Sequence, residues 1–317
     1  MVATSVLLVF CAFQSAGPIE PRIELTAKAE ALPRADLSVD VPLVLIPVHV
    51  TTPLGASVPN LPKSSFHLFE NGVEQTITHF SSEDAPLSIG FLFDASGSMR
   101  NKLRKSAEAA AAFFRTANTD DEFFLIDFNE RPRLAIPFTQ NAGAITRHIA
   151  HTHADGRTSL LDAIHLALEQ MEFAKNLRKA IVIVSDGGDN RSRYTETEIK
   201  SALREADVQL YAMGIFDPDE SPKRTPEERN GPKLLDELAE QTGGRHYPVQ
   251  NLDELASVCE RIGRELRNEY LIGYAPANDA QDGTYRKVKV TVTPPSGMPE
   301  LRAHHRQGYY APALFGR

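Results

Sequence analysis

Between residues 87 and 267, short apolar runs alternate with longer segments in which apolar side chains recur at helical spacing. The apolar runs lie at 87–93, 122–128, 179–185, 208–215 and 245–249, and the helical segments at 100–117, 141–152, 159–174, 195–206, 231–241 and 251–267. Such alternation is typical of a parallel sheet that helices cover on both faces, so it predicts a doubly wound α/β fold of Rossmann-like type. One further run, at 133–139, follows the second strand so closely that we expect it to pair antiparallel at the sheet edge.

The segments on either side of this region have the pattern of strands without helices. Strand-like runs lie at 41–52, 66–80, 269–276, 284–293 and 301–312. Asn71-Gly72 supplies the two positive-φ residues of a type I′ hairpin turn. Because no helices cover these strands, we expect the N- and C-terminal strands to pack together as a small all-β sandwich that flanks an inserted α/β domain. The predicted parts are 39–82, 85–268 and 269–317, with a solvated, charged loop at 217–233.

The N-terminus, MVATSVLLVFCAFQSAG, is an apolar run that ends in small residues, as in a secretory signal. The run is too short to span a membrane. We therefore expect a signal peptide at 1–17 and a solvated leader at 18–38, with a buried N-terminal strand as the alternative interpretation. The mature chain would then be exported, to a periplasm or to the extracellular space, without a transmembrane segment.

Composition excludes two classes of partner or cofactor. The chain has 34 basic and 42 acidic residues and a net charge of −8, so it lacks the broad basic field that binds nucleic acid. Only Cys259 would remain after removal of the signal, which leaves no internal disulfide and no support for a zinc site. Cys259 shares helical spacing with Leu255 and Ile262, so we expect it to be a core residue and not a nucleophile.

Polar side chains gather where the predicted parallel strands end. Asp94, Ser96 and Ser98 follow the first strand, Thr158 opens a helix, and Asp186 ends the third strand. In a doubly wound sheet these ends meet at one edge, where ligands bind. All five side chains are oxygen donors, which favours a hard divalent cation, Mg²⁺ before Mn²⁺ or Ca²⁺. Since the two carboxylates only balance such an ion, the site would retain affinity for a further carboxylate.

The motif DASGSM, with GRTSLLDAI and VSDGGDN downstream, resembles the von Willebrand factor type A domain and its metal-ion-dependent adhesion site. The resemblance covers about residues 85–268, and the flanking strands are similar to those of a bacterial, exported family related to it. It implies that Ser96 and Ser98 bind the ion directly, that Thr158 does so directly or through water, and that Asp94 and Asp186 act mainly through water.

Arg157 departs from the family pattern, which commonly has glycine there. Its guanidinium would disfavour the ion, help to hold a partner's carboxylate, or point into solvent.

The sequence therefore predicts a secreted, non-enzymatic adhesion module that recognises an acidic group on a protein or surface partner through the cation. One alternative is a structural component of an envelope assembly, in which the ion only stabilises the fold. Another is that Ser98 merely caps the following helix. Enzyme hypotheses lack the necessary groups: a phosphatase of the haloacid dehalogenase type needs an acid where Ser96 stands, and His151 and His153 have no nucleophile to serve.

Overall fold

A six-stranded sheet forms the centre of the α/β region. The computed structural model describes residues 43–216 and 225–313, so the predicted signal peptide and leader lie outside the described residues. The sheet order is β10-β9-β8-β5-β6-β7. The strands are β5 (Leu87–Asp94), β6 (Glu122–Phe128), β7 (Pro132–Thr139), β8 (Arg178–Ser185), β9 (Gln209–Ile215) and β10 (His246–Val249). All neighbours are parallel except β7, which pairs antiparallel to β6 at the edge as predicted.

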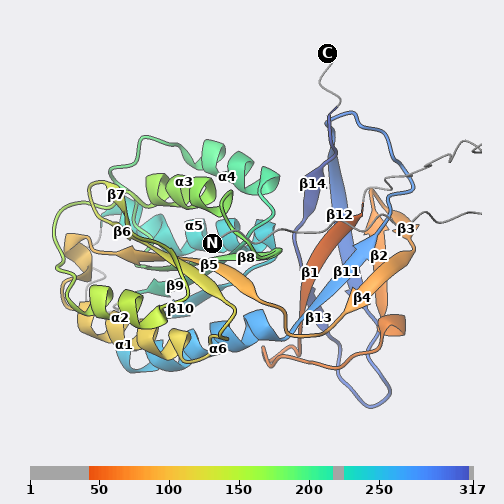
Figure 1. The fold of residues 1–317 in the computed structure, drawn as a ribbon, viewed down its shortest axis with the longest axis horizontal. Helices are drawn as coiled ribbons and strands as arrows, with labels where there is room; N and C mark the ends of the chain where they lie inside the picture. Colours follow the sequence, from red (N-terminus) through yellow and green to blue (C-terminus); the bar gives the residue numbers. More distant parts are fainter. Residues whose placement is uncertain (1–42, 217–224, 314–317) are drawn as a thin grey trace, which may run out of the picture. The chain divides into compact units, whose positions relative to one another are not determined.

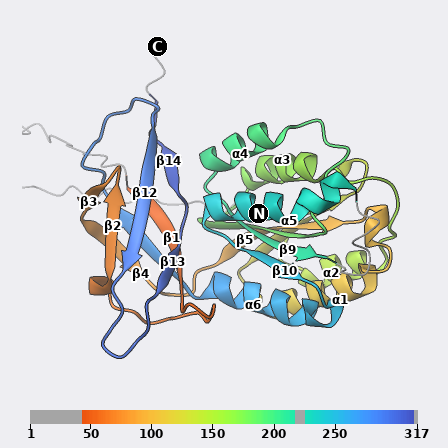
Figure 2. The same ribbon diagram turned by 180° about the vertical axis from the view of Figure 1, so that it is seen from behind.

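Helices cover both faces of this sheet (Figures 1 and 2). They are α1 (Leu103–Phe114), α2 (Ala142–Ala150), α3 (Leu160–Met171), α4 (Glu196–Glu205), α5 (Pro226–Thr242) and α6 (Leu255–Arg267). One apolar core lies between the sheet and α1, α2 and α6, and a second lies between the sheet and α3, α4 and α5. Strand β5 is buried along its whole length, because it lies in the middle of the sheet with helices on either side.

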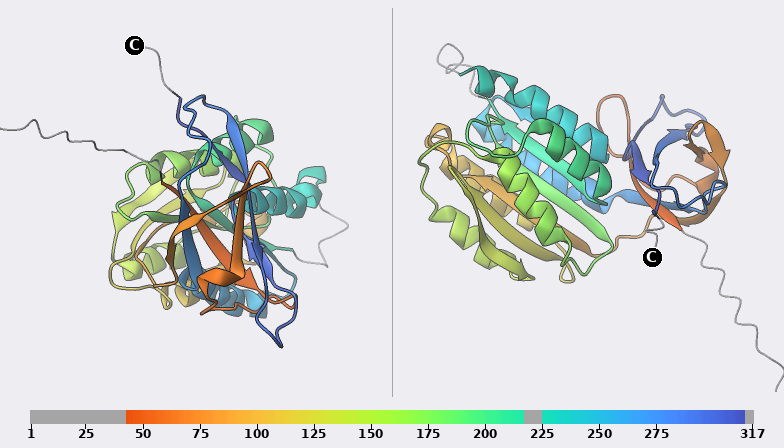
Figure 3. Two further views of the ribbon diagram at one scale, coloured as in Figure 1. Left: turned by 90° about the vertical axis from the view of Figure 1, so that its right-hand side faces the viewer. Right: turned by 90° about the horizontal axis from the view of Figure 1, so that it is seen from above.

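The remaining strands form two antiparallel sheets of four strands each, with the orders β13-β1-β11-β4 and β14-β12-β2-β3 (Figure 3). They are β1 (Val44–Thr51), β2 (Phe66–Glu70), β3 (Val73–Gln75), β4 (Ile77–Ser81), β11 (Glu269–Tyr274), β12 (Tyr285–Val292), β13 (Arg302–His304) and β14 (Gly308–Tyr310). A third apolar core includes residues of both sheets. Asn71 and Gly72 have φ of 49° and 85°, as the hairpin turn requires. The predicted fold class, a doubly wound α/β domain flanked by a small sandwich of N- and C-terminal strands, is confirmed.

Three local predictions need correction. The loop expected at 217–233 is helical from Pro226, because α5 continues through Pro232, where one helical hydrogen bond is lost. The stretch 301–312, expected as one strand, is split into β13 and β14, which belong to different sheets. Finally, α1 begins at Leu103 and not at residue 100, because residues 97–99 form a separate 3₁₀ turn. Within the described ranges, no helix combines the length and the apolar character needed to cross a membrane.

Candidate metal centre

The two predicted carboxylates lie at the point where the winding of the sheet reverses. Strand β5 lies between β8 and β6, so the chain leaves it toward one edge and later returns on its other side. Asp94 is the last residue of β5, and Asp186 follows directly after β8. Both residues are buried. The parallel pairing of β5 with β8 therefore brings the two carboxylates to the same end of the sheet.

Hydrogen bonds fix the position of the Asp94 carboxylate. The backbone N–H of Ser96 donates to Oδ1 over 2.8 Å, and the Ser185 hydroxyl donates to Oδ2 over 2.6 Å. Burial and the nearby charge of Asp186 raise the pKa of Asp94 to about 7, although the bonds from Ser185 and Ser96 oppose this shift. Two buried acids thus repel each other at the end of the sheet.

The serine hydroxyls predicted as neutral ligands face each other in the turn after Asp94. Ser96 Oγ lies 3.1 Å from Ser98 Oγ. Ser96 precedes the 3₁₀ turn and makes no side-chain capping bond. The alternative that Ser98 caps the helix is wrong, because α1 begins at Leu103 with Lys102 as its N-cap residue. Neither serine serves the helix start, so a capping role does not explain this pair.

Backbone hydrogen bonds hold the Thr158 segment against the turn that follows Asp94. The N–H of Gly97 donates to the Gly156 carbonyl over 3.0 Å, and the N–H of Asp155 donates to the Ala95 carbonyl over 2.9 Å. Thr158 itself is buried.

The Thr158 segment is also joined to the loop after β8. The Thr158 N–H donates to Asn190 Oδ1, the N–H of Asn190 donates to the Thr158 carbonyl, and both distances are 3.1 Å. All three segments that carry the predicted donors are thereby tied together.

Lys102 is a neighbour of the site that the sequence does not predict. Its side chain is 4% exposed, and Nζ lies 3.5 Å from Asp186 Oδ2. One ammonium group beside two buried carboxylates leaves excess negative charge when both acids are ionised. The signal for Lys102 was weak, since it stands between Ser98 and a helix where lysine is ordinary.

Arg157, by contrast, is exposed, and no hydrogen bond or ion pair to its side chain is found in the part of the chain that the structure describes. Of the three roles predicted for it, this position agrees with a side chain that points into solvent.

The donor chemistry fits a hard cation. Two carboxylates and three hydroxyls offer only oxygen, and a divalent ion would offset the repulsion between Asp94 and Asp186. Across residues 43–216 and 225–313, no group of three or more His, Cys, Asp or Glu side chains is arranged to hold a metal ion. A cation held here would therefore depend on the hydroxyls of Ser96, Ser98 and Thr158.

Four further side chains could in principle serve other chemistry: Cys259, His151, His153 and His165. Cys259 is fully buried in the apolar core, and burial raises the pKa of its thiol, as expected for a core residue. The ring of His165 stacks on the ring of Tyr194, with 3.9 Å between the ring centroids, so it makes a packing contact. His151 and His153 line a cavity beside the turn after Asp94.

Residues 89–188, which include all the predicted ligands, match the family model of the von Willebrand factor type A domain. Over 153 residues the chain is 29% identical to inter-alpha-trypsin inhibitor heavy chain H2 of Mus musculus. This match covers 42% of this chain and 16% of that protein. It is also 28% identical over 201 residues to inter-alpha-trypsin inhibitor heavy chain H4 of Sus scrofa. This match covers 59% of this chain and 20% of that protein. The chain thus spans about a fifth or less of the length of these relatives.

Among solved structures, von Willebrand factor type A from Catenulispora acidiphila is similar, with a TM-score of 0.49 and 15% identity over 77% of this chain and 73% of that chain. The family match identifies residues 89–188, within the α/β region, as von Willebrand factor type A sequence, which agrees with the predicted resemblance. A domain of this type indicates a protein-interaction module.

Proposed function

We propose that this protein is a non-enzymatic binding module whose type A domain holds a divalent cation and uses it to recognise an acidic group on a protein partner. Asp94, Ser96, Ser98, Thr158 and Asp186 would hold the cation, with Mg²⁺ as the expected ion. The cation would supply a positive centre that attracts a carboxylate. The protein's own residues supply the oxygen donors and keep them in place.

The observation that carries this proposal is the pair of buried acids, Asp94 and Asp186, beside serine hydroxyls at the switch point of the sheet. Burying two ionised carboxylates together is costly unless positive charge compensates them. Lys102 supplies one such charge, at Asp186. A divalent cation would supply the rest and still leave affinity for an acidic ligand.

Two features support a binding role over a catalytic one. The hydroxyl of Ser96 takes the place where an acid of phosphatase type would stand, and it cannot act as a general acid at ordinary pH. His151 and His153 lie in the loop that follows α2, and no pairing of either ring with a serine hydroxyl is found in the described part of the chain. We further propose that the protein is exported, since its N-terminal sequence has the pattern of a secretory signal.

The proposal is tested by capturing proteins from a cell-envelope extract on the immobilised protein. The capture is carried out in Mg²⁺, in chelator, and with Asp94→Ala in place of the wild-type chain. In a parallel arm, the carboxylates of the extract are first converted to amides with a carbodiimide and an amine, and the control extract receives the amine alone. Thermal unfolding is followed in the same buffers.

We expect the same proteins to be captured only in Mg²⁺, only by the wild-type chain, and only from the extract with intact carboxylates. If chelator lowers the melting temperature but leaves the capture unchanged, the ion stabilises the fold without binding a partner, and the structural alternative holds. Capture from the amidated extract would contradict recognition of an acidic group.

A further inference from the structure

A cavity of about 880 Å³ lies beside the candidate metal centre. Its walls come from the end of β6, the turn into β7, helix α2 and the loop after α2. The cavity also reaches Ala95, the residue between Asp94 and Ser96 in the candidate site. Its volume is within the range of about 300–1,000 Å³ that ligand sites usually have. A ligand at the metal centre would therefore have a second binding region next to it.

The cavity is strongly basic in a chain whose net charge is −8. Its lining includes three arginines and three histidines: Arg131, Arg133, Arg147, His148, His151 and His153. Asp127 is the one acidic residue among the residues that line it. The basic character is thus a local property of this cavity, opposite in sign to the chain as a whole.

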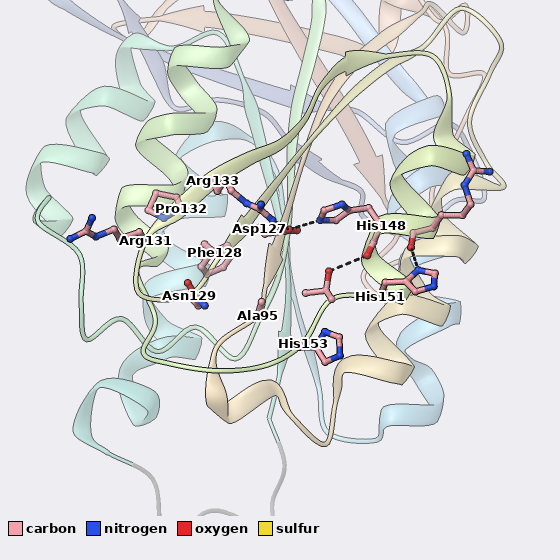
Figure 4. Close-up of a pocket in the computed structure, with 12 residues that line it drawn as sticks. Ala95, Asp127, Phe128, Asn129, Arg131, Pro132, Arg133, His148, His151 and His153 are labelled. Atoms are coloured by element: carbon pink, nitrogen blue, oxygen red, sulfur yellow. Dashed lines mark hydrogen bonds and ion pairs between the residues drawn. The ribbon is translucent and has the colours of Figure 1, made fainter.

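Asp127 does not neutralise the cavity, because two of the basic side chains already share one of its oxygens. His148 Nε2 lies 2.6 Å and Arg133 Nη2 3.3 Å from Asp127 Oδ2. Figure 4 shows Asp127 and His148 pointing toward each other across the cavity. For Arg131 and Arg147 no ion pair is found in the described parts of the chain, so their charges remain available to a ligand.

The loop after α2 adds two imidazole rings to the cavity, those of His151 and His153. His151 Nδ1 lies 2.7 Å from the Arg147 carbonyl, which can only accept, so Nδ1 carries the hydrogen. Its Nε2 faces no partner in the described part of the chain, and it can donate to an anion when the ring carries both protons. No partner for the ring of His153 is found among the residues described, and Figure 4 shows this ring on the same loop. The cavity therefore combines His148 and Arg133, which Asp127 holds, with Arg131 and Arg147, for which no ion pair is found in the described residues.

From this arrangement we propose that the cavity is an anion subsite for a second acidic side chain on the same partner segment. This inference rests on the proposed function, since it places the first carboxylate of that segment at the cation. A peptide extends by about 3.3–3.6 Å per residue, so residues close together in one segment can reach both the cavity and the adjoining turn. The partner would then present a short acidic stretch and not an isolated carboxylate.

The test measures binding of a hexaglutamate peptide by calorimetry, in Mg²⁺ and in chelator, with a hexaglutamine peptide as the neutral control. The variant chain carries Arg131→Gln and Arg147→Gln, two exposed side chains whose loss should not disturb the fold. The matched control carries Arg264→Gln and Arg302→Gln, which remove the same charge at exposed sites away from the cavity. A fragment of a sulfated polysaccharide is titrated in a separate arm.

We expect hexaglutamate to bind the wild-type and control chains equally and the Arg131/Arg147 variant at least about tenfold more weakly, because hydrogen bonds to charged groups contribute on that order. Equal binding by all three chains would overturn the subsite, even where Mg²⁺ strengthens binding and so supports the proposed function. If the variant weakens binding but Mg²⁺ has no effect, the subsite stands and the metal-dependent function fails. Tighter binding of the polysaccharide, with the same dependence on the arginines, would overturn the assignment to an acidic protein segment.

Discussion

Asp94 has a more strongly perturbed environment than the other predicted ligands. Its carboxylate is fully buried, accepts hydrogen bonds from Ser96 and Ser185, and lies close enough to Asp186 for that charge to help raise its pKa to about 7. The pKa of the folded state therefore lies above the ordinary value of 3.8. The folded chain binds this proton more tightly than the unfolded chain does.

The raised pKa of Asp94 makes the metal-free protein less stable at higher pH. In the metal-free protein, ionisation of Asp94 lowers the free energy of unfolding as the pH rises from about 4 to about 7, by an amount on the order of 2–4 kcal/mol. Asp94→Asn cannot ionise and should not show this part of the loss. Urea unfolding in chelator at several pH values measures the difference between the two chains, and an equal dependence on pH in both would contradict the environment described for Asp94.

The residues of the candidate site differ in how far the sequence could predict them. Asp94, Ser96 and Ser98 lie within one short motif, and Thr158 and Asp186 stand at strand and helix ends that the apolar pattern places. Ser185, Asn190 and Lys102 were not predicted as neighbours of the site. Their roles depend on contacts with residues distant in the chain, such as Ser185 with Asp94, and common residue types carry no local signal for such contacts.

Among the elements, the loop after β8 and helix α5 approach each other through glycines. Gly187 has φ of 77°, and a Cβ added there would lie 2.8 Å from the backbone of Gly231. Gly72, in the hairpin turn, has φ of 85° but no atom within 4 Å of such a Cβ. The two glycines therefore share the same backbone requirement and differ in the space around them.

This difference gives a prediction for alanine substitutions. Gly72→Ala should cost only the strain of a positive φ, about 1 kcal/mol. Gly187→Ala should cost about 3 kcal/mol, because α5 must also move, and it should weaken Mg²⁺ binding since Asp186 is its neighbour. Denaturant unfolding measures the two losses of stability, and calorimetry measures Mg²⁺ binding by the Gly187→Ala chain. Similar losses for the two variants would show that the close approach of Gly187 to Gly231 is not rigid.

The pattern of apolar residues predicted the strands and helices well and their ends less well. Alternation of apolar runs with helical spacing identified the sheet strands, because buried strands and amphipathic helices have different periods. The start of α5 was missed by five residues, since proline and charged residues indicated a loop where the helix in fact continues through Pro232. The division of 301–312 between two sheets depends on pairing with β1 and β12, which the sequence of that stretch does not encode.

At the scale of the whole described chain, buried polar groups of the sandwich and of the α/β domain lie close together. His49 of β1 has Nδ1 3.5 Å from Glu265 Oε2, and Arg245 donates to Glu265 Oε1 over 3.0 Å. Burial, together with His304 and Arg245, lowers the pKa of His49 to about 3, so this ring is neutral at ordinary pH. Arg178 also binds Glu269 over 2.8 Å, at the point where the chain enters β11.

Two glutamates of α6 can be compared to measure how much the buried contacts of Glu265 contribute to stability. Glu265 is 1% exposed and pairs with Arg245, whereas Glu260 is 36% exposed and pairs with Arg115. Glu265→Ala removes a fully buried carboxylate and leaves the half-buried Arg245 guanidinium without its ion-pair partner, so it should cost about 3 kcal/mol. Glu260→Ala should cost less than about 1 kcal/mol, because water screens the surface pair. Thermal unfolding of both variants measures these losses of stability. Equal losses would contradict a structural role for the buried contact of Glu265.

The general plan of the molecule was predictable because strands without covering helices must find each other. The sequence therefore indicated that the N- and C-terminal strands share one core, as they do. It did not indicate the buried contact of His49 with Glu265. Each residue alone is typical of a solvated position, and only the packing of β1 against α6 brings them together.

The central claim is that Asp94, Ser96, Ser98, Thr158 and Asp186 hold a divalent cation. Calorimetric titration of Mg²⁺ into the metal-free protein tests it most directly, with Ser257→Ala as a control at an exposed serine far along the chain. We expect one ion to bind the wild-type chain and the control with the same affinity, weaker binding by Ser98→Ala, and none by Asp94→Ala. The absence of binding to the wild-type chain, or equal binding by Asp94→Ala, would contradict the account.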